Sequence, residues 1–199
     1  MIIPQAANVT SALYRHLIPA MWIAWAAYWW ISSRAVKANV RRDTPLSRLA
    51  YHGPLVLAAL LLMGRIAPVP LLEERFVPQA PWLFIVAAAL TGAGILFSVW
   101  ARRHLGAYWS ATVTIKEGHQ LITTGPYAIV RHPIYTGLLL ALVGTALAVG
   151  EWRGVVAVAL AAVSIYPKIR LEERWMREQF GEKYRAYCQH VPALIPFVI

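Results

Sequence analysis

The chain has few charges and almost no cysteine. Only 14% of its 199 residues are charged and 59% are hydrophobic, and the mean hydropathy of +0.52 lies outside the usual range of soluble domains. Its single cysteine, Cys188, excludes a disulfide framework and a cysteine-based metal site. We expect no bound metal. Internal repeats and low-complexity stretches are also absent, so residues 1–199 are interpreted as one domain with lipid as its main solvent.

Acidic residues are scarce relative to basic ones, with nine Asp and Glu against nineteen Lys and Arg and a net charge of +10. Such a charge could indicate a nucleic-acid-binding protein. The basic residues here flank apolar blocks, however, and form neither an arm nor a groove interleaved with polar sequence. Membrane topology therefore explains the charge better, and we expect no nucleic-acid partner.

Long apolar blocks are abundant, and about 20 residues suffice for a helix to cross a bilayer. The last block is long enough for two helices that fold back near Gly150–Gly154. The sequence therefore predicts an all-α polytopic membrane protein with about five transmembrane helices. The blocks are His16–Ile31, Leu49–Met63, Trp82–Ala101 and Thr136–Ile169.

Lysine and arginine in short loops set the orientation, because such loops stay cytoplasmic. Fifteen of the nineteen basic residues fall between the first two blocks, after the third block or after the last. This bias predicts an external N-terminus and a cytoplasmic C-terminus. The start of the chain lacks the basic region and the small-residue cleavage pattern of a signal peptide, so we expect the first helix to be retained.

Two polar regions then share the cytoplasmic face. The first runs from His119 to Gly137 and concentrates rings, turn residues and charges between apolar blocks. The second is the tail, where the last helix should extend past the bilayer to Phe180 and stop at Gly181. A short helix with Tyr184 and Tyr187 on one face should follow.

Each of these residues also has a purely structural interpretation. Arg170, Glu173 and Arg177 are spaced for ion pairs that only solvate a helix face. His132 could be a turn residue beside proline, and Tyr127 and Tyr135 could anchor the chain at the headgroup level. Their concentration near the membrane boundary, where unpaired polar groups are costly, favours a site.

The order of motifs resembles the isoprenylcysteine carboxyl methyltransferase family of integral membrane enzymes. Gly-Pro-Tyr, Arg-His-Pro-x-Tyr-x-Gly, an apolar hairpin, Glu-Glu, Phe-Gly-x-x-Tyr-x-x-Tyr and Val-Pro follow one another between His119 and Pro196. The matching residues are Gly125, Pro126, Tyr127, Arg131, His132, Pro133, Tyr135, Gly137, Glu172, Glu173, Phe180, Gly181, Tyr184, Tyr187, Val191 and Pro192. Residues 1–101 match only as hydrophobic helices, so the catalytic and cofactor region is expected within 102–199.

The resemblance implies S-adenosyl-L-methionine as the methyl donor, bound at the cytoplasmic face between the His119–Gly137 segment and the tail. A sulfonium cofactor needs a carboxylate, aromatic faces and hydrogen-bonding groups, and this region contains all three. By resemblance, the cofactor-binding residues are expected to be His119, Gln120, Leu121, Gly125, Tyr127, His132, Pro133, Tyr135, Glu172, Tyr184 and Tyr187.

The sequence defines the methyl acceptor less closely than the methyl donor. A carboxylate acceptor needs a cation to orient it, for which Arg170 held by Glu173 is the first candidate and Arg131 the second. A thiol or amine acceptor instead needs a proton acceptor, and Glu173 or His132 could serve. The resemblance implies a lipid-like acceptor, with an isoprenylcysteine carboxylate first and a phospholipid amine or small thiol as alternatives. An NADPH-dependent reductase on a related scaffold and a non-catalytic membrane protein are the remaining alternatives.

The predicted five-helix length resembles prokaryotic members of the family. This likeness implies a prokaryotic inner membrane as the location. The expected partners are membrane lipid and a lipid-like or prenylated small molecule, and the sequence leaves the oligomeric state open.

Overall fold

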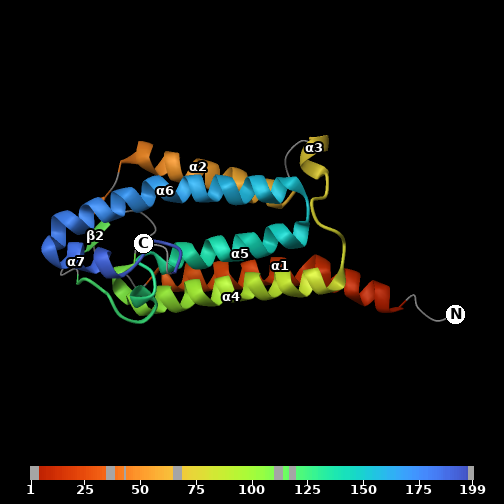
Figure 1. Ribbon diagram of the computed structural model, residues 1–199, viewed down its shortest axis with the longest axis horizontal. Helices are drawn as coiled ribbons and strands as arrows, with labels where there is room; N and C mark the ends of the chain where they lie inside the picture. Colours follow the sequence, from red (N-terminus) through yellow and green to blue (C-terminus); the bar gives the residue numbers. More distant parts are fainter. Residues whose placement is uncertain are drawn as a thin grey trace.

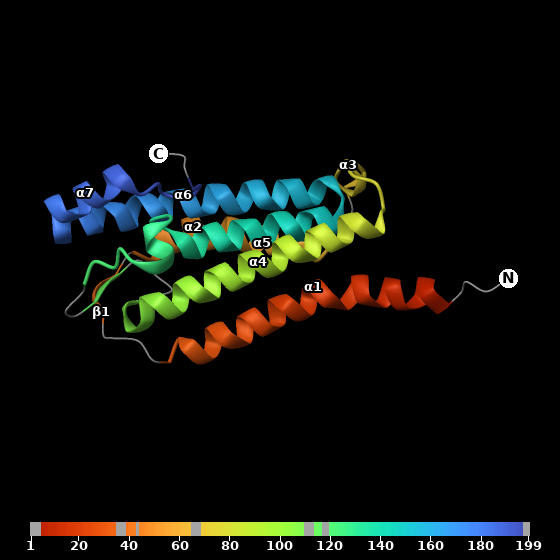
Figure 2. The ribbon, with the colours of Figure 1, turned by 60° about the horizontal axis from the view of Figure 1, so that its bottom comes forward.

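A computed structural model describes residues 5–34, 39–42, 44–64, 69–109, 114–116 and 120–196. Within these ranges, five long helices lie alongside one another in an elongated bundle (Figures 1 and 2). They are α1 (Gln5–Ser32), α2 (Pro45–Leu62), α4 (Pro81–Leu105), α5 (Pro133–Val149) and α6 (Trp152–Phe180). Each overlaps an apolar block identified in the sequence, so the predominantly helical fold is confirmed.

Two of these helices have the length and hydropathy of membrane spans. The stretches Pro81–Tyr108 and Trp152–Phe180 satisfy both criteria, and Arg48–Leu62 and Pro133–Val149 are shorter apolar helices. Large apolar side chains such as Ile85, Leu96 and Val163 are exposed on the outer surface of the bundle. Lipid contact explains such exposure better than water does.

Short elements connect the long helices or follow the last of them. They are α3 (Pro70–Glu73), the 3-10 turns η1 (Gly106–Tyr108) and η2 (Gly125–Ala128), helix α7 (Glu182–His190), and strands β1 (Asn39–Arg42) and β2 (Thr114–Lys116). The strands form an antiparallel pair that joins the α1–α2 connection to the segment after α4. The sequence analysis did not predict this pair, although the β-branched run Thr112–Ile115 is typical of a strand.

Helices α4 and α5 pack almost backbone to backbone. A Cβ atom added at Gly144 would lie 2.5 Å from the Thr91 amide nitrogen and 2.6 Å from the Ala87 carbonyl oxygen. Gly137, about two turns before Gly144 on α5, faces Gly94 of α4 in the same way. Small residues at such positions let two helices approach closely, as Gly94 of α4 and Gly137 of α5 do here.

The end of α6 follows the expectation closely. Its 29 residues span roughly 43 Å at 1.5 Å per residue, more than the ~30 Å hydrocarbon core. The helix ends at Gly181, whose φ of +53° favours glycine, and α7 begins at the next residue. In Figure 1, α7 lies at the end of the bundle where α4 ends and α5 begins.

Candidate functional site

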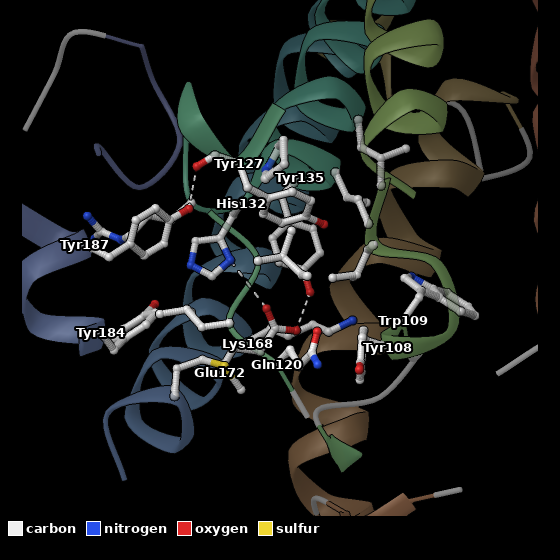
Figure 3. A pocket seen from close by; sticks show the side chains of 18 of the residues that line it. Tyr108, Trp109, Gln120, Tyr127, His132, Tyr135, Lys168, Glu172, Tyr184 and Tyr187 are labelled. Atoms are coloured by element: carbon white, nitrogen blue, oxygen red, sulfur yellow. Dashed lines mark hydrogen bonds and ion pairs between the residues drawn. The ribbon is translucent and has the colours of Figure 1, made fainter. Parts of the chain in front are cut away.

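A cavity of about 340 Å³ lies at this end of the bundle (Figure 3). One wall comes from the 120–135 segment, the second half of α6 and α7. The opposite wall comes from α1, α2 and the end of α4. Nearly all the residues predicted to bind a cofactor fall on the first wall.

The segment between α4 and α5 reaches the cavity through the η2 turn. Gly125 opens that turn beside the ring of His104, whose Nε2 lies 2.9 Å from the Thr124 hydroxyl. Tyr127 follows and is buried in the cavity wall, and burial raises the pKa of its phenol far above the usual value. The Tyr187 hydroxyl donates a 2.6 Å hydrogen bond to the Tyr127 carbonyl, which ties α7 to the turn.

His132 bridges two neighbouring carboxylates of α6. Its Nδ1 lies 3.4 Å from Glu172 Oε2 and its Nε2 lies 3.4 Å from Glu173 Oε1. Burial lowers the pKa of His132, but the contacts with Glu172 and Glu173 outweigh it and raise the pKa above the ordinary histidine value. The imidazole therefore favours its charged form between the two glutamates.

Glu172 is the carboxylate that faces the cavity. The Tyr135 hydroxyl donates a 2.6 Å hydrogen bond to its Oε1, and the Tyr135 ring stacks on the His132 ring with centroids 5.8 Å apart. Figure 3 shows Glu172 directed into the cavity between these partners. A carboxylate held this firmly beside aromatic faces is suited to a cationic or hydrogen-bond-donating ligand.

Glu173 points away from the cavity and anchors the 131–132 segment to α6. Its Oε1 accepts from Arg131 Nε at 2.9 Å and lies 2.8 Å from Arg131 Nη2, and its Oε2 pairs with Arg177 at 2.8 Å. The expected pairing of Glu173 with Arg170 is therefore wrong. Arg170 is exposed on the outer face of α6, because Lys168 and Glu172, one turn apart, occupy the cavity face.

The residues after α7 dock against the start of α5. The Arg131 and His132 amides donate to the Pro192 and Ala193 carbonyls at 2.8 and 3.0 Å. The Thr136 hydroxyl donates to the Leu194 carbonyl at 2.6 Å. Burial lowers the pKa of Arg131, but its contacts with Glu173 outweigh this and raise it, so the guanidinium stays charged at the centre of this junction.

The opposite wall is aromatic and apolar, and the sequence analysis did not identify it. The rings of Trp25 and Trp29, one helical turn apart, stack with centroids 4.6 Å apart. Trp29 meets Trp109 edge to face at 5.9 Å, and Trp25 Nε1 donates to the Ser98 hydroxyl at 3.1 Å. His52 and Leu55 on α2 complete this wall. The spacing of Trp25 and Trp29 was the signal available in the sequence.

The cavity thus brings together most of the residues predicted to form the site. The lining includes Arg131 and the cofactor candidates Gln120, Leu121, Tyr127, His132, Pro133, Tyr135, Glu172, Tyr184 and Tyr187. Gly125 and Glu173 lie behind it, Arg170 lies outside it, and His119 is outside the described residues. Among the residues that the structure describes, no group of three or more His, Cys, Asp or Glu could hold a metal ion.

Comparisons with known proteins match the same part of the chain. Protein-S-isoprenylcysteine O-methyltransferase B of Arabidopsis thaliana is 37% identical over 84 residues, which are 42% of this chain and 43% of that protein. The cobalt-zinc-cadmium resistance protein CzcN of Cupriavidus metallidurans is 37% identical over 95 residues, 46% of this chain and 43% of that protein. The protein-S-isoprenylcysteine O-methyltransferase of Schizosaccharomyces pombe is 33% identical over 83 residues, 41% of this chain and 35% of that protein.

The chain spans less than half the length of each of these relatives. The resemblance to isoprenylcysteine carboxyl methyltransferases that the motifs indicated is confirmed. The model of the phospholipid methyltransferase family matches residues 82–183, which make up about half of the 199 residues. This stretch contains Tyr127, His132, Tyr135 and Glu172, and the chain belongs to the phospholipid methyltransferase family.

Proposed function

We propose that this protein is a membrane methyltransferase that uses S-adenosyl-L-methionine and acts on a lipid-like acceptor. The observation that carries the proposal is Glu172, a carboxylate directed into an aromatic-lined cavity and fixed there by Tyr135 and His132. Membership of the phospholipid methyltransferase family supports the reaction class. The names of the relatives from A. thaliana and S. pombe support methylation of an isoprenylcysteine carboxylate.

The first wall fits the proposed cofactor. Glu172 would accept hydrogen bonds from the ligand, and the Tyr127, Tyr184 and Tyr187 rings offer faces for a purine or a sulfonium cation. Gln120 and Leu121 add backbone donors and acceptors at the cavity edge. When bound, the cofactor supplies an electrophilic methyl carbon, and the electron pair of the broken carbon–sulfur bond remains on sulfur.

The chain's own contribution is to position the two reactants and exclude water. Methyl transfer is an in-line displacement, which needs the nucleophile about 3–3.5 Å from the methyl carbon. His132, Arg131 and Glu173 hold the start of α5 against α6, so that the carboxylate and the rings of this wall keep a fixed geometry. We assign to Arg131 and Glu173 this positioning role. Arg170, to which the sequence analysis gave the acceptor-orienting role, is exposed and outside the cavity lining, so that role is assigned below to another residue, and an Arg170 variant tests the choice.

The second wall fits the acceptor's tail. Trp25, Trp29 and Leu55 present apolar surface inside a bundle whose exterior is itself apolar. An isoprenyl or acyl chain could pack there as it packs in a bilayer. We further propose five transmembrane helices, an external N-terminus, a cytoplasmic site and a prokaryotic inner-membrane location.

Calorimetric titration of the purified protein with S-adenosylhomocysteine and with NADPH tests the proposal. We expect S-adenosylhomocysteine to bind and NADPH not to bind. Glu172→Gln should weaken binding by about 1–3 kcal/mol, because the buried carboxylate would lose its charge-assisted contacts. Glu178→Gln, on the exposed surface of the same helix, is the matched control. NADPH binding without S-adenosylhomocysteine binding would indicate a reductase instead.

A further inference from the structure

Lys168 occupies a position in the cavity that neither the motifs nor the proposed cofactor contacts explain. It lies on α6 one turn before Glu172, so both side chains extend from the same face of the helix (Figure 3). Its Nζ lies 5.1 Å from the ring centroid of Tyr51 and 5.3 Å from that of Tyr135. These distances are within the range of cation–π attraction, so the two rings fix where the ammonium lies.

The two rings belong to different helices. Tyr135 lies on α5 beside His132 and Glu172, whereas Tyr51 precedes His52 on α2, which packs along α6 and whose His52 and Leu55 line the cavity. The Lys168 ammonium therefore lies where the proposed cofactor wall meets the apolar wall. In a methyltransferase that binds a lipid tail along the apolar wall, the reacting head of the acceptor must reach this boundary.

The charges lining the cavity suit a negatively charged acceptor head. Among the described lining residues, Lys168, Arg131 and the charged His132 are cationic and Glu172 is the carboxylate. Arg131 is paired with Glu173 behind the wall, and Glu172 contacts His132 and Tyr135 and interacts electrostatically with Lys168. A sulfonium cofactor brings further positive charge. An ammonium head would thus meet like charge, which is the arrangement that rejects a ligand.

We propose that Lys168 orients the anionic head of the acceptor and selects a carboxylate over a protonated amine. This inference rests on the proposed methyltransferase function and deepens it by naming the residue that recognises the head of the acceptor. A carboxylate carries no proton at neutral pH, so its oxygen can form the new carbon–oxygen bond without a general base. Lys168 then has only to hold the carboxylate of the acceptor where the cofactor wall meets the apolar wall. A charge-assisted hydrogen bond between the ammonium and the carboxylate would do this.

The test compares Lys168→Gln with Arg170→Gln and with Lys183→Gln, an exposed lysine on α7 outside the cavity. S-adenosylhomocysteine affinity is measured first by calorimetry. Binding of radiolabelled N-acetyl-S-farnesylcysteine and of its uncharged carboxamide to the S-adenosylhomocysteine-loaded protein is measured next. Initial rates with the carboxylate and with phosphatidylethanolamine, at varied concentrations, then separate KM from kcat.

We expect Lys168→Gln to weaken carboxylate binding and raise its KM by about tenfold to a hundredfold, the range of a lost charge-assisted hydrogen bond. Affinity for the carboxamide and for S-adenosylhomocysteine should stay within about twofold. Lys168→Arg should recover most of the carboxylate affinity, since it keeps the charge. Arg170→Gln and Lys183→Gln should behave like the parent protein.

Three results would overturn the inference. The first is an equal loss of carboxylate and carboxamide affinity in Lys168→Gln, which indicates a structural role. The second is loss of carboxylate binding in Arg170→Gln alone, or no carboxylate binding by the parent protein. The third is efficient methylation of phosphatidylethanolamine that depends on Lys168, which would assign the ammonium to a lipid phosphate. A parent protein that fails to bind S-adenosylhomocysteine would instead refute the proposed function.

Discussion

Glu173→Gln should destabilise the protein more than any surface change of the same kind. The side chains of Glu173 and Arg131 are 6% and 12% exposed, and one carboxylate oxygen lies within 2.9 Å of two guanidinium nitrogens. Glutamine keeps the shape but removes the charge, which leaves the guanidinium buried without a counter-ion. Breaking a buried pair in this way costs about 3–5 kcal/mol. For a chain of this size that corresponds to a fall in melting temperature of roughly 6–20 °C.

Melting of the detergent-solubilised protein, followed by intrinsic fluorescence, measures this loss. Glu182→Gln is the matched control, because Glu182 and Arg185 form an exposed pair on α7, with side chains 82% and 64% exposed, and such pairs contribute little. A double variant, Glu173→Gln with Arg131→Gln, should recover part of the loss, since no unpaired charge remains. The reasoning fails if Glu173→Gln melts within about 2 °C of the Glu182→Gln control.

Three further predictions concern the packing of α4 against α5, the protonation of His132 and the membrane topology. Gly144→Ala should destabilise the protein by about 1–3 kcal/mol because its Cβ would overlap Thr91 and Ala87. Gly92→Ala is the control and should be near neutral, since its Cβ would lie 3.9 Å from the nearest atom, in Met21. Equal melting temperatures of the two variants would contradict the close α4–α5 contact. Glu172 and Glu173 raise the pKa of His132 in the folded protein. The charged imidazole therefore stabilises the folded state fully below the unfolded pKa of about 6.5, and this contribution is lost as the pH rises through the folded pKa. The melting temperature should therefore fall above about pH 6.5 in the parent protein and change less in His132→Gln, and a pH-independent parent would exclude a charged His132. Reporters placed near Arg41 and after Ile199 should read cytoplasmic and one near Trp152 external, and a cytoplasmic reading near Trp152 would break the five-span topology.

Local patterns in the sequence were sufficient to predict the helices but not the contacts between them. Long apolar blocks predicted α1, α2, α4, α5 and α6, and Gly181 predicted the end of α6. These features depend on hydrophobicity and backbone preference within one stretch of sequence. The family motifs also located Tyr127, His132, Tyr135 and Glu172, which the structure gathers around one cavity.

The remaining features depend on distant neighbours. Glu173 is three residues from Arg170 and 42 from Arg131, and only the docking of the 131–132 segment on α6 makes the second contact form. The same docking decides which face of α6 is the cavity face, so Lys168 could not be distinguished from Arg170 by spacing. Trp25, Trp29 and His52 have no neighbouring motif to mark them, because their wall exists only once α1 and α2 are in place.

The part of the apolar wall that comes from α1 and α2 precedes the family-matched stretch of the sequence, and this has an evolutionary consequence. Glu172, His132 and Tyr135 lie inside the family-matched stretch 82–183, whereas Trp25, Trp29, His52 and Leu55 lie before it. Mutations in the first two long helices can therefore reshape the apolar wall without altering the carboxylate wall. A lineage could in this way acquire a new acceptor by drift or recombination in its N-terminal half while inheriting the donor chemistry unchanged.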